Sequence, residues 1–457
     1  MQVLNTYFPT STRRRGAGLL RGAAMAVLAV SLGACSVFDK GDPETTPTVG
    51  NRTPILSKIE SGAKVDPALA NVPVVLPAQQ VNAEWAQAGG SASKSYGHLA
   101  LSASPSRAWS VDIAGGNTRR RLAASPVIGN GIMFVYDTAG TVQAFDADTG
   151  ARLWQHSLES EGAGSNSLFG GGVSYGEGRV YATTGLGEVA ALDAQTGAEI
   201  WRVNLNSPLR GAPTLAFGEV FVMTQDNRIY ALDSQDGSQN WTEAGSSGQS
   251  GVFGVAAPAA GQGTVIAGYS SGELIAYRYE NGRNLWADAL SRTSISTSVG
   301  TLTDIDADPI IDSGRVYALG QGGRMAAYEL VTGQRIWELN LAGISTPAVA
   351  GDWIFTLTDD ARMLAISRAT GKVRWIAQLA HYRKPKNKEG EIFWSGPVLA
   401  GERLWIANSR GELWAVNAAD GEATRVAELN AGVSLAPVVA NNTLYVLDES
   451  GRITAFR

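Results

Sequence analysis

The chain has 457 residues, of which 44% are hydrophobic and 17% are charged, and it contains one cysteine. The apolar fraction is ample for a packed core, and a single cysteine excludes any disulfide within the chain. The formal net charge of −5 argues against a partner that presents a phosphate backbone, so we expect no nucleic-acid partner.

The first 34 residues carry arginines and no acidic residue, and they end in a small-apolar run from Gly22 to Ala34. These 13 residues are too few to span a bilayer and have the form of a signal peptide's apolar region. The run continues into Cys35 as Leu-Gly-Ala-Cys, which resembles the bacterial lipoprotein signal. We predict cleavage before Cys35 and acylation of its sulfur and new amino group; an incidental buried thiol is the alternative.

Removal of residues 1–34 leaves 33 basic and 42 acidic residues, so the mature chain has a net charge of −9. Residues 35–80 are rich in Pro, Thr and Gly over most of their length, and we predict a lipidated N-terminus followed by a flexible tether. Ser36 resembles the residue that directs lipoproteins to the outer membrane. The predicted location is therefore the periplasmic face of the outer membrane, with residues 81–457 as the folded domain.

The folded part repeats one unit eight times, with an apolar strand, a polar turn and a second strand. Every copy has alanine four residues after its start, and copy starts lie 38 to 51 residues apart, the length expected for four short strands. We expect the alanine to occupy a crowded position, such as the channel side of radially packed sheets. The copies start at Gly140, Gly187, Asn227, Gly272, Gly323, Ala361, Gly411 and Gly451.

A Gly-x-x-x-Trp tail follows the turn in six copies, and the seventh has Arg425 in the Trp place. We expect these aromatic rings to dock one blade on the next as large apolar anchors. A Pro-led strand opens seven of the eight blades, where the missing N–H costs no ladder bond. The predicted docking residues are Trp109, Trp154, Trp201, Trp241, Trp286, Trp337 and Trp375.

The eighth copy ends at Arg457, before its turn and its Trp strand. The missing strand is present at residues 106–113, which contain Trp109. An N-terminal strand that completes the last blade removes an open edge. The sequence therefore predicts an all-β fold, an eight-bladed β-propeller with four antiparallel strands per blade and the last blade closed by an N-terminal strand.

The repeat Ala-x-Asp-x-x-Thr-Gly-x-x-x-Trp at residues 191–201 resembles the docking repeat of quinoprotein dehydrogenases. The alternative hypothesis is thus a periplasmic dehydrogenase that uses pyrroloquinoline quinone (PQQ), which would need a Ca²⁺ site, an Asp base and partners for the quinone carboxylates. No such set is recognisable, and His98, His156 and His381 fit no metal spacing. We predict a non-enzymatic binding protein with no catalytic residue, metal or cofactor; a propeller that binds cell-wall polymer stays open.

Two stretches depart from the blade pattern, residues 206–213 before the third blade and residues 298–309 before the fifth. Each is either a solvated connection or a binding surface. Asp304, Asp306 and Asp308 could form a Ca²⁺ loop, but the Gly turn and distal Glu of an EF-hand are missing. The basic insertion at residues 381–388 is expected to be a solvated loop.

The lipoprotein signal, the quinoprotein-like propeller and the missing quinone site together resemble the BamB family, outer-membrane lipoproteins of the β-barrel assembly machinery. The family pattern Leu-x-Leu-Arg-Gly is matched at Leu209, Arg210 and Gly211, with Ser207 in place of the first leucine. The family's Ser-Asp-x-Asp is matched at Asp304 and Asp306.

The resemblance implies that these loops bind a POTRA domain of the barrel-inserting subunit, BamA. As a hypothesis, Leu209 fills an apolar pocket, Arg210 forms charge-assisted bonds, and Asp304 and Asp306 pair with basic or backbone donors. Unpaired outer strands could also guide unfolded outer-membrane protein clients by strand addition.

Overall fold

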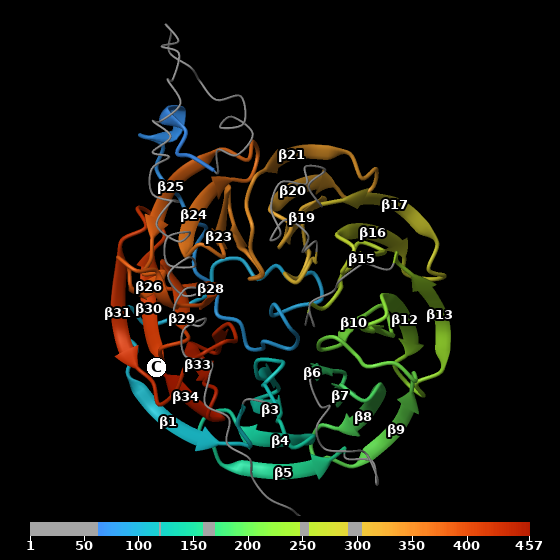
Figure 1. The fold of residues 1–457 in the computed structure, drawn as a ribbon. Coiled ribbons are helices and arrows are strands. Elements are labelled where there is room, and N and C mark those ends of the chain that lie inside the picture. Colours follow the sequence, from blue (N-terminus) through green and yellow to red (C-terminus); the bar gives the residue numbers. More distant parts are fainter. Residues whose placement is uncertain (1–62, 118–119, 159–169, 247–255, 291–303) are drawn as a thin grey trace, which may run out of the picture. The chain divides into compact units, whose positions relative to one another are not determined.

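The computed structural model describes residues 63–117, 120–158, 170–246, 256–290 and 304–457. Figure 1 shows their strands as eight four-stranded antiparallel sheets, or blades, arranged around a ring. The predicted eight-bladed propeller is confirmed. None of the helical segments in these ranges combines the length and hydropathy of a membrane span.

The two inner strands of each blade are the most deeply buried. The innermost strands, from blade 1 to blade 8, are β2 (Val127–Gly129), β6 (Gly171–Gly176), β10 (Thr214–Ala216), β14 (Ala259–Gly261), β18 (Ile310–Asp312), β22 (Ala348–Ala350), β28 (Trp394–Ala400) and β32 (Val438–Ala440). The second strands are β3 (Ile132–Tyr136), β7 (Arg179–Thr184), β11 (Glu219–Met223), β15 (Thr264–Gly268), β19 (Arg315–Gly320), β23 (Trp353–Leu357), β29 (Arg403–Asn408) and β33 (Thr443–Leu447).

The third strands are buried over most of their length, whereas many residues of the outer strands are exposed. The third strands are β4 (Thr141–Asp146), β8 (Glu188–Asp193), β12 (Arg228–Asp233), β16 (Glu273–Arg278), β20 (Arg324–Glu329), β24 (Arg362–Ser367), β30 (Glu412–Asn417) and β34 (Arg452–Phe456). The outer strands are β5 (Arg152–Ser157), β9 (Glu199–Asn204), β13 (Gln239–Ala244), β17 (Asn284–Ala289), β21 (Arg335–Leu339), β25 (Val373–Gln378), β31 (Ala423–Glu428) and β1 (Arg107–Asp112).

The invariant alanine does not face the channel, so that expectation was wrong. It lies on the third strand, where Ala191 pairs with Tyr181 of β7 on one side and Trp201 of β9 on the other. The same register recurs in blade 1, where Ala144 lies between Phe134 and Trp154. The position is crowded because two large rings flank it, and a larger side chain there would displace one of them.

Blade 8 is built from both ends of the chain, as predicted. β1 pairs antiparallel with β34, with Trp109 opposite Ala455 and Asp112 opposite Arg452. Beyond the strands, the amide of Ser106 donates to Arg457 O at 2.6 Å and the amide of Arg457 donates to Ser106 O at 2.8 Å. The termini of the propeller are therefore tied by a continuous ladder.

Residues 80–101, here called the plug, run through the inside of the ring, where Figure 1 shows them as a blue trace. The plug forms hydrogen bonds to the innermost strand of every blade except blade 6. Its partners are Ile128, Tyr175, Leu215, Ala260, Ile311, Leu399 and Val439.

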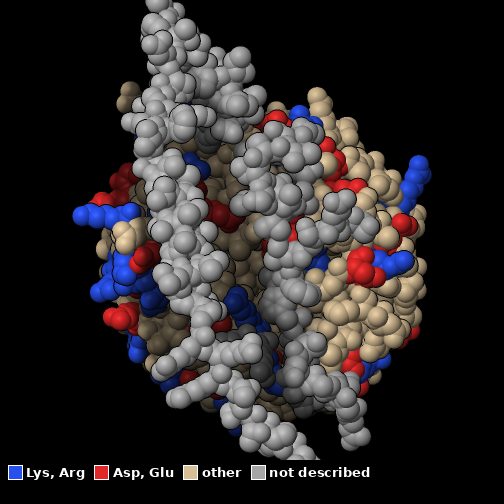
Figure 2. Space-filling view, in the orientation of Figure 1, with Lys and Arg blue, Asp and Glu red and all other residues tan. Residues whose placement is uncertain are grey.

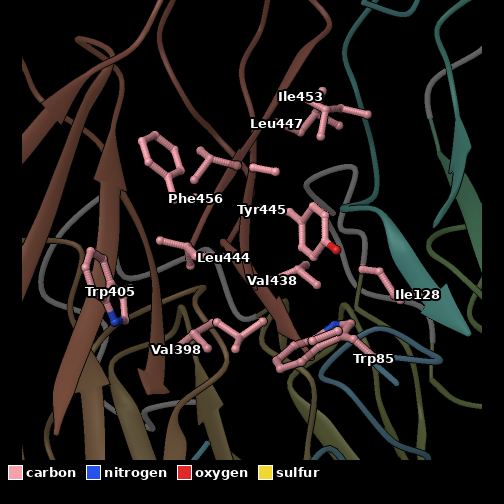
Figure 3. Packing of buried hydrophobic residues seen from close by; sticks show 14 of the residues in the cluster. Trp85, Ile128, Val398, Trp405, Val438, Leu444, Tyr445, Leu447, Ile453 and Phe456 are labelled. Carbon is pink, nitrogen blue, oxygen red and sulfur yellow. The ribbon is translucent and has the colours of Figure 1, made fainter. Parts of the chain in front are cut away.

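Trp85 anchors the plug and is 4% exposed. Figure 3 shows its ring beside Ile128, Val398 and Val438, which belong to blades 1, 7 and 8. The Trp85 and Tyr96 rings lie 4.9 Å apart between centroids. A large aromatic buried among three blades contributes several kcal/mol, so we expect the plug to stabilise the ring as well as fill it.

Two further segments lie outside the blades. Residues 63–80, in the stretch predicted as tether, contain the 3-10 helix η2 (Pro67–Leu69), and the amide of Asp66 donates to Val373 O at 2.9 Å. The basic insertion forms a hairpin of β26 (Tyr382–Lys384) and β27 (Glu389–Glu391) rather than an irregular loop.

Candidate functional site

The two loops predicted to bind a partner lie on one face of the ring. This connection face carries the links from the outer strand of each blade to the innermost strand of the next. Residues 205–213 join β9 to β10, and residues 304–309 lead into β18. Arg210 Nη2 and Asp306 Oδ1 are 3.1 Å apart, so a salt bridge brings together loops that lie 96 residues apart in sequence.

Arg210 is held by four blades and is 1% exposed. Its amide donates to Met223 O at 2.8 Å, and its carbonyl accepts from the amide of Gly171 at 3.1 Å. Its guanidinium also donates to Gly268 O at 3.4 Å. The Nε of Arg210 has no hydrogen-bond partner within the described structure. Arg210 therefore connects blades 2, 3 and 4 to the segment that enters blade 5.

Leu209 and Asp304 are both fully buried. Leu209 packs within the core that contains Tyr181 and Trp201, between blades 2 and 3. The carbonyl of Asp304 accepts from the amide of Gln321 at 2.9 Å, which ties its loop to the turn between β19 and β20. Both residues lie below the surface of the connection face and hold the backbone of its loops in place.

The surroundings of Asp306 disfavour its charged form. Burial raises the pKa of Asp306 to about 6; the Arg210 guanidinium opposes that rise, and the carboxylates of Asp304 and Asp359 reinforce it. Burial is the largest of these effects, and among the described residues it outweighs the favourable charge of Arg210.

A cavity of about 310 Å³ lies inside the ring, between the plug and the connection face. The plug contributes Trp85 and Tyr96 to its lining, and the segments that begin the innermost strands form its walls. Among the described residues, Asp306 and Asp308 are the charged ones that line it. The loop that carries the salt bridge therefore also borders the cavity.

Lys94 lies in the plug beside this cavity and is 1% exposed. Its Nζ donates to Thr214 Oγ1 at 3.1 Å. Burial lowers the pKa of Lys94 to about 8, and the charge of Asp308 acts in the opposite direction. Sequence reasoning missed this residue; the signal was a lone lysine in a plug whose other charged side chain is Glu84.

The cavity does not fit the quinone of the alternative hypothesis. PQQ is a polyanion, and its carboxylates require cationic partners. In the part of the chain that the structure describes, the lining offers the carboxylates of Asp306 and Asp308 but no Lys or Arg side chain. Within the described ranges, no group of three or more His, Cys, Asp or Glu residues has a metal-binding arrangement.

The predicted docking tryptophans lie against the glycine turn of the next blade. Each of six indoles donates from Nε1 to a carbonyl in or beside that turn: Trp154 to Ala194, Trp201 to Ser234, Trp241 to Tyr279, Trp286 to Leu330, Trp337 to Arg368 and Trp375 to Ala418. The Trp109 ring lies at Gly150, but its Nε1 has no partner in the described structure, and Tyr445 donates to the corresponding carbonyl of Ala147.

Cys35 and the first part of the second loop, residues 298–303, lie outside the described residues. Figure 2 shows acidic and basic side chains intermixed over the described surface in that view, with Lys and Arg gathered on the flank that carries β31. The hairpin of β26 and β27 adds exposed Arg383 and Lys384 to the connection between blades 6 and 7.

Comparison with known proteins gives a consistent result. A family model described as outer membrane protein assembly factor BamB matches residues 138–377 and 381–457. The BamB of Yersinia pestis is 27% identical over 359 residues, which is 77% of this chain and 89% of that protein.

Solved structures share the fold. The crystal structure of BamB from Moraxella catarrhalis has a TM-score of 0.65 at 22% identity and covers 77% of this chain and 99% of its own. A quinohemoprotein alcohol dehydrogenase from Comamonas testosteroni has a TM-score of 0.64 at 16% identity, over 82% of this chain and 80% of its own.

Proposed function

The chain belongs to the BamB family of outer membrane protein assembly factors, and from that premise we propose that it is a non-enzymatic scaffold of the β-barrel assembly machinery. In this proposal it binds a POTRA domain of the barrel-inserting subunit, BamA, and so assists the folding and insertion of outer-membrane proteins. Its relatives carry the name of an assembly factor, and the association with the outer membrane follows from the family.

The observation that supports this binding site is the salt bridge between Arg210 and Asp306. It joins the two loops that match the family pattern into one surface, although they lead into blades 3 and 5. Because Leu209, Arg210 and Asp304 are buried and the Asp306 side chain is 9% exposed, direct contact with a partner is out of their reach in this conformation. We propose that they fix the backbone of the loops, whose exposed Asn206 and Pro208 meet the POTRA domain.

We further propose that Cys35 carries the lipid that holds the protein on the periplasmic face of the outer membrane. One acyl chain gives only marginal membrane binding, so acylation of both the sulfur and the amino group is needed for a stable anchor.

Unfolded outer-membrane proteins are proposed as additional, transient partners. Their extended segments would add to the open edges of the outer strands. These strands present exposed apolar side chains at equivalent positions in four blades: Leu153, Ile200, Leu285 and Ile336. An edge with free backbone groups and apolar side chains is suited to strand addition.

The experiment is a pull-down from detergent-solubilised outer membrane that compares the wild type with variants of two kinds. Asn206→Asp together with Pro208→Glu changes the charge of the exposed loop alone, because aspartate tolerates the left-handed backbone of residue 206, where φ is 57°. The pair Arg210→Met with Asp306→Asn removes both buried charges at once, so that neither is left unpaired. Ala198→Arg, in the exposed turn between β8 and β9 on the opposite face of the ring, is the matched control.

We expect the surface variant to lose BamA while its circular dichroism and melting temperature stay unchanged, and the control to retain it. The charge-pair variant should bind more weakly, because its loops are less well fixed. Retention of BamA by both variants would place the contact elsewhere on the ring. If the wild type itself captures no BamA, the proposed partner is wrong.

A further inference from the structure

The cavity inside the ring is closed at one end by the plug. Gln87, Ala92 and Ser93 bond to the middle residues of β10, β14 and β18, while the cavity is lined largely by the segments that lead into the innermost strands. Its 310 Å³ lies within the range of small-ligand sites.

Most of the cavity wall is apolar, and Ser and Thr side chains from several segments interrupt it. Trp85, Tyr96 and Trp394 supply aromatic surface, and Pro and Val residues from several blades complete it. Asp306 and Asp308, which belong to the same loop, supply the two carboxylates of the lining. A cavity of this kind has one end suited to a hydrocarbon stem and one suited to a charge.

The sign of that charge follows from the bonding of the two carboxylates. Asp306 is 9% exposed at its side chain and receives one hydrogen bond, from Arg210 to Oδ1, so Oδ2 has no partner within the described structure. Asp308 Oδ1 accepts from the amide of Ala257 at 2.8 Å. Arg210 acts on Asp306 and Lys94 acts on Asp308, but neither cation is among the described residues that line the cavity, which presents the two carboxylates. An anion would be repelled, whereas a cation would take the open position at Asp306.

We propose that this cavity is a binding site for a cationic group, an ammonium or guanidinium, carried on an apolar stem. The cation lies at Asp306 and Asp308, and the stem packs against Trp85, Tyr96 and Trp394. The ligand is either a basic side chain of a bound polypeptide or a free small amine. The site is separate from the exposed loop residues proposed to meet the POTRA domain, so failure of either proposal leaves the other standing.

The test uses three probes of equal length on the full mature chain: hexylamine, 1-hexanol and hexanoate. The protein is labelled with 5-fluorotryptophan, and the ¹⁹F resonances of Trp85 and Trp394 are assigned by Trp→Phe variants and followed in titrations at pH 7.5. Hexylamine should shift both resonances and bind about tenfold more tightly than hexanol, the worth of one partly screened ion pair. Hexanoate should bind more weakly still.

Two variants separate the charge from the cavity. Asp308→Asn keeps an acceptor for the amide of Ala257 and should weaken hexylamine about tenfold with no effect on hexanol. Ala436→Trp places a ring at the exposed mouth of the cavity and should abolish binding of both. Because Ala436 is exposed, this variant is expected to fold even if Asp308→Asn does not.

A capped peptide with one central lysine distinguishes the two sources of the cation. If it binds at least as tightly as hexylamine, the ligand is a polypeptide side chain; if hexylamine binds and the peptide does not, the ligand is a small amine. Equal affinity for hexylamine and hexanol, preference for hexanoate, or binding that survives Ala436→Trp would overturn the proposal.

Discussion

Each docking tryptophan lies over a glycine whose backbone is in the left-handed region. Gly197 has φ +73°, and a Cβ added there would lie 2.5 Å from the Trp154 ring. Gly178 has φ +74°, but a Cβ there would meet no atom within 4 Å. Both positions need a residue that tolerates the left-handed backbone, but only Gly197 must also lack a side chain to leave room for the tryptophan ring.

We expect Gly178→Ala to lower the free energy of unfolding by about 1 kcal/mol, the cost of a left-handed alanine. Gly197→Ala should lower it by about 3 kcal/mol, because overpacking against Trp154 is added. Urea unfolding of both variants measures the difference. Equal losses would mean that the ring moves away at no cost and that docking contributes little.

The same geometry explains the one blade that lacks a docking ring. Arg425 of β31 replaces the tryptophan of blade 7, and its side chain is 53% exposed. The turn on which a ring would dock joins the third and fourth strands of the next blade. In blade 8 those strands, β34 and β1, come from opposite ends of the chain, so no such turn exists. The substitution therefore marks blade 7 as the one that precedes the closing blade.

Asp306 gives the stability of the protein a defined pH dependence. Its folded pKa of about 6 is above the ordinary value of 3.8 because burial, Asp304 and Asp359 outweigh Arg210. The folded state then holds the proton more tightly than the unfolded state, so this contribution to stability is complete below pH 4 and is lost as pH rises through 6. The loss should reach about 3 kcal/mol.

Urea unfolding of the wild type and of Asp306→Asn from pH 4 to pH 7.5 tests this dependence. The variant changes the pairing of Arg210 at every pH, which gives a constant offset, so only the slope is diagnostic. The wild type should lose stability relative to the variant as pH rises. Parallel curves would show that Asp306 is ionised across this range.

At the scale of elements, the blades could be predicted and the plug could not. Glycine, alanine and tryptophan recur at fixed spacing in the blades because each copy meets the same neighbours. Residues 80–101 meet a different blade every few residues and bind them largely through the backbone, which leaves no side-chain pattern. Scarcity of charge is the one signal: Glu84 and Lys94 are the only Lys, Arg, Asp or Glu in those residues.

For the candidate site, the sequence identified the two loops but not the burial of their residues. The family pattern at Leu209, Arg210, Asp304 and Asp306 identified the loops, and the structure brings Arg210 and Asp306 together. Their burial could not be predicted, because a charged loop residue is usually exposed. The pairing that makes burial tolerable depends on the distance between blades 3 and 5, which no local pattern contains.

The plug should contribute to the stability of the inner strands. We expect Trp85→Ala to lower the free energy of unfolding by about 3–5 kcal/mol through loss of packing among three blades. Hydrogen exchange should then quicken at the amides of Ala260 and Ile311, which donate to Ala92 O and Ser93 O of the plug. Amides of β24 in blade 6, whose innermost strand has no described bond to the plug, are the internal control.

At the scale of the whole molecule, the ring depends on the ladder between β1 and β34. The ladder is reinforced by Arg452, whose Nε lies 2.8 Å from Asp112 Oδ1, and β34 also pairs with β33. Removal of β34 would leave β1 without a partner and would open two strand edges at the junction of the termini. An exposed edge favours association with another chain.

A chain that ends at residue 451 should therefore lose its cooperative unfolding transition or melt far below the wild type, and it should form oligomers. A synthetic peptide of residues 448–457, added in excess, should restore the monomer. It should also raise the melting temperature as its concentration rises, because it binds the folded ring and not the unfolded chain. The control replaces residues 383–390, the outer part of the β26–β27 hairpin, with a short Gly-Ser link and should melt as the wild type does. If the truncated chain also melts as the wild type does, the other blades hold the ring closed without the ladder.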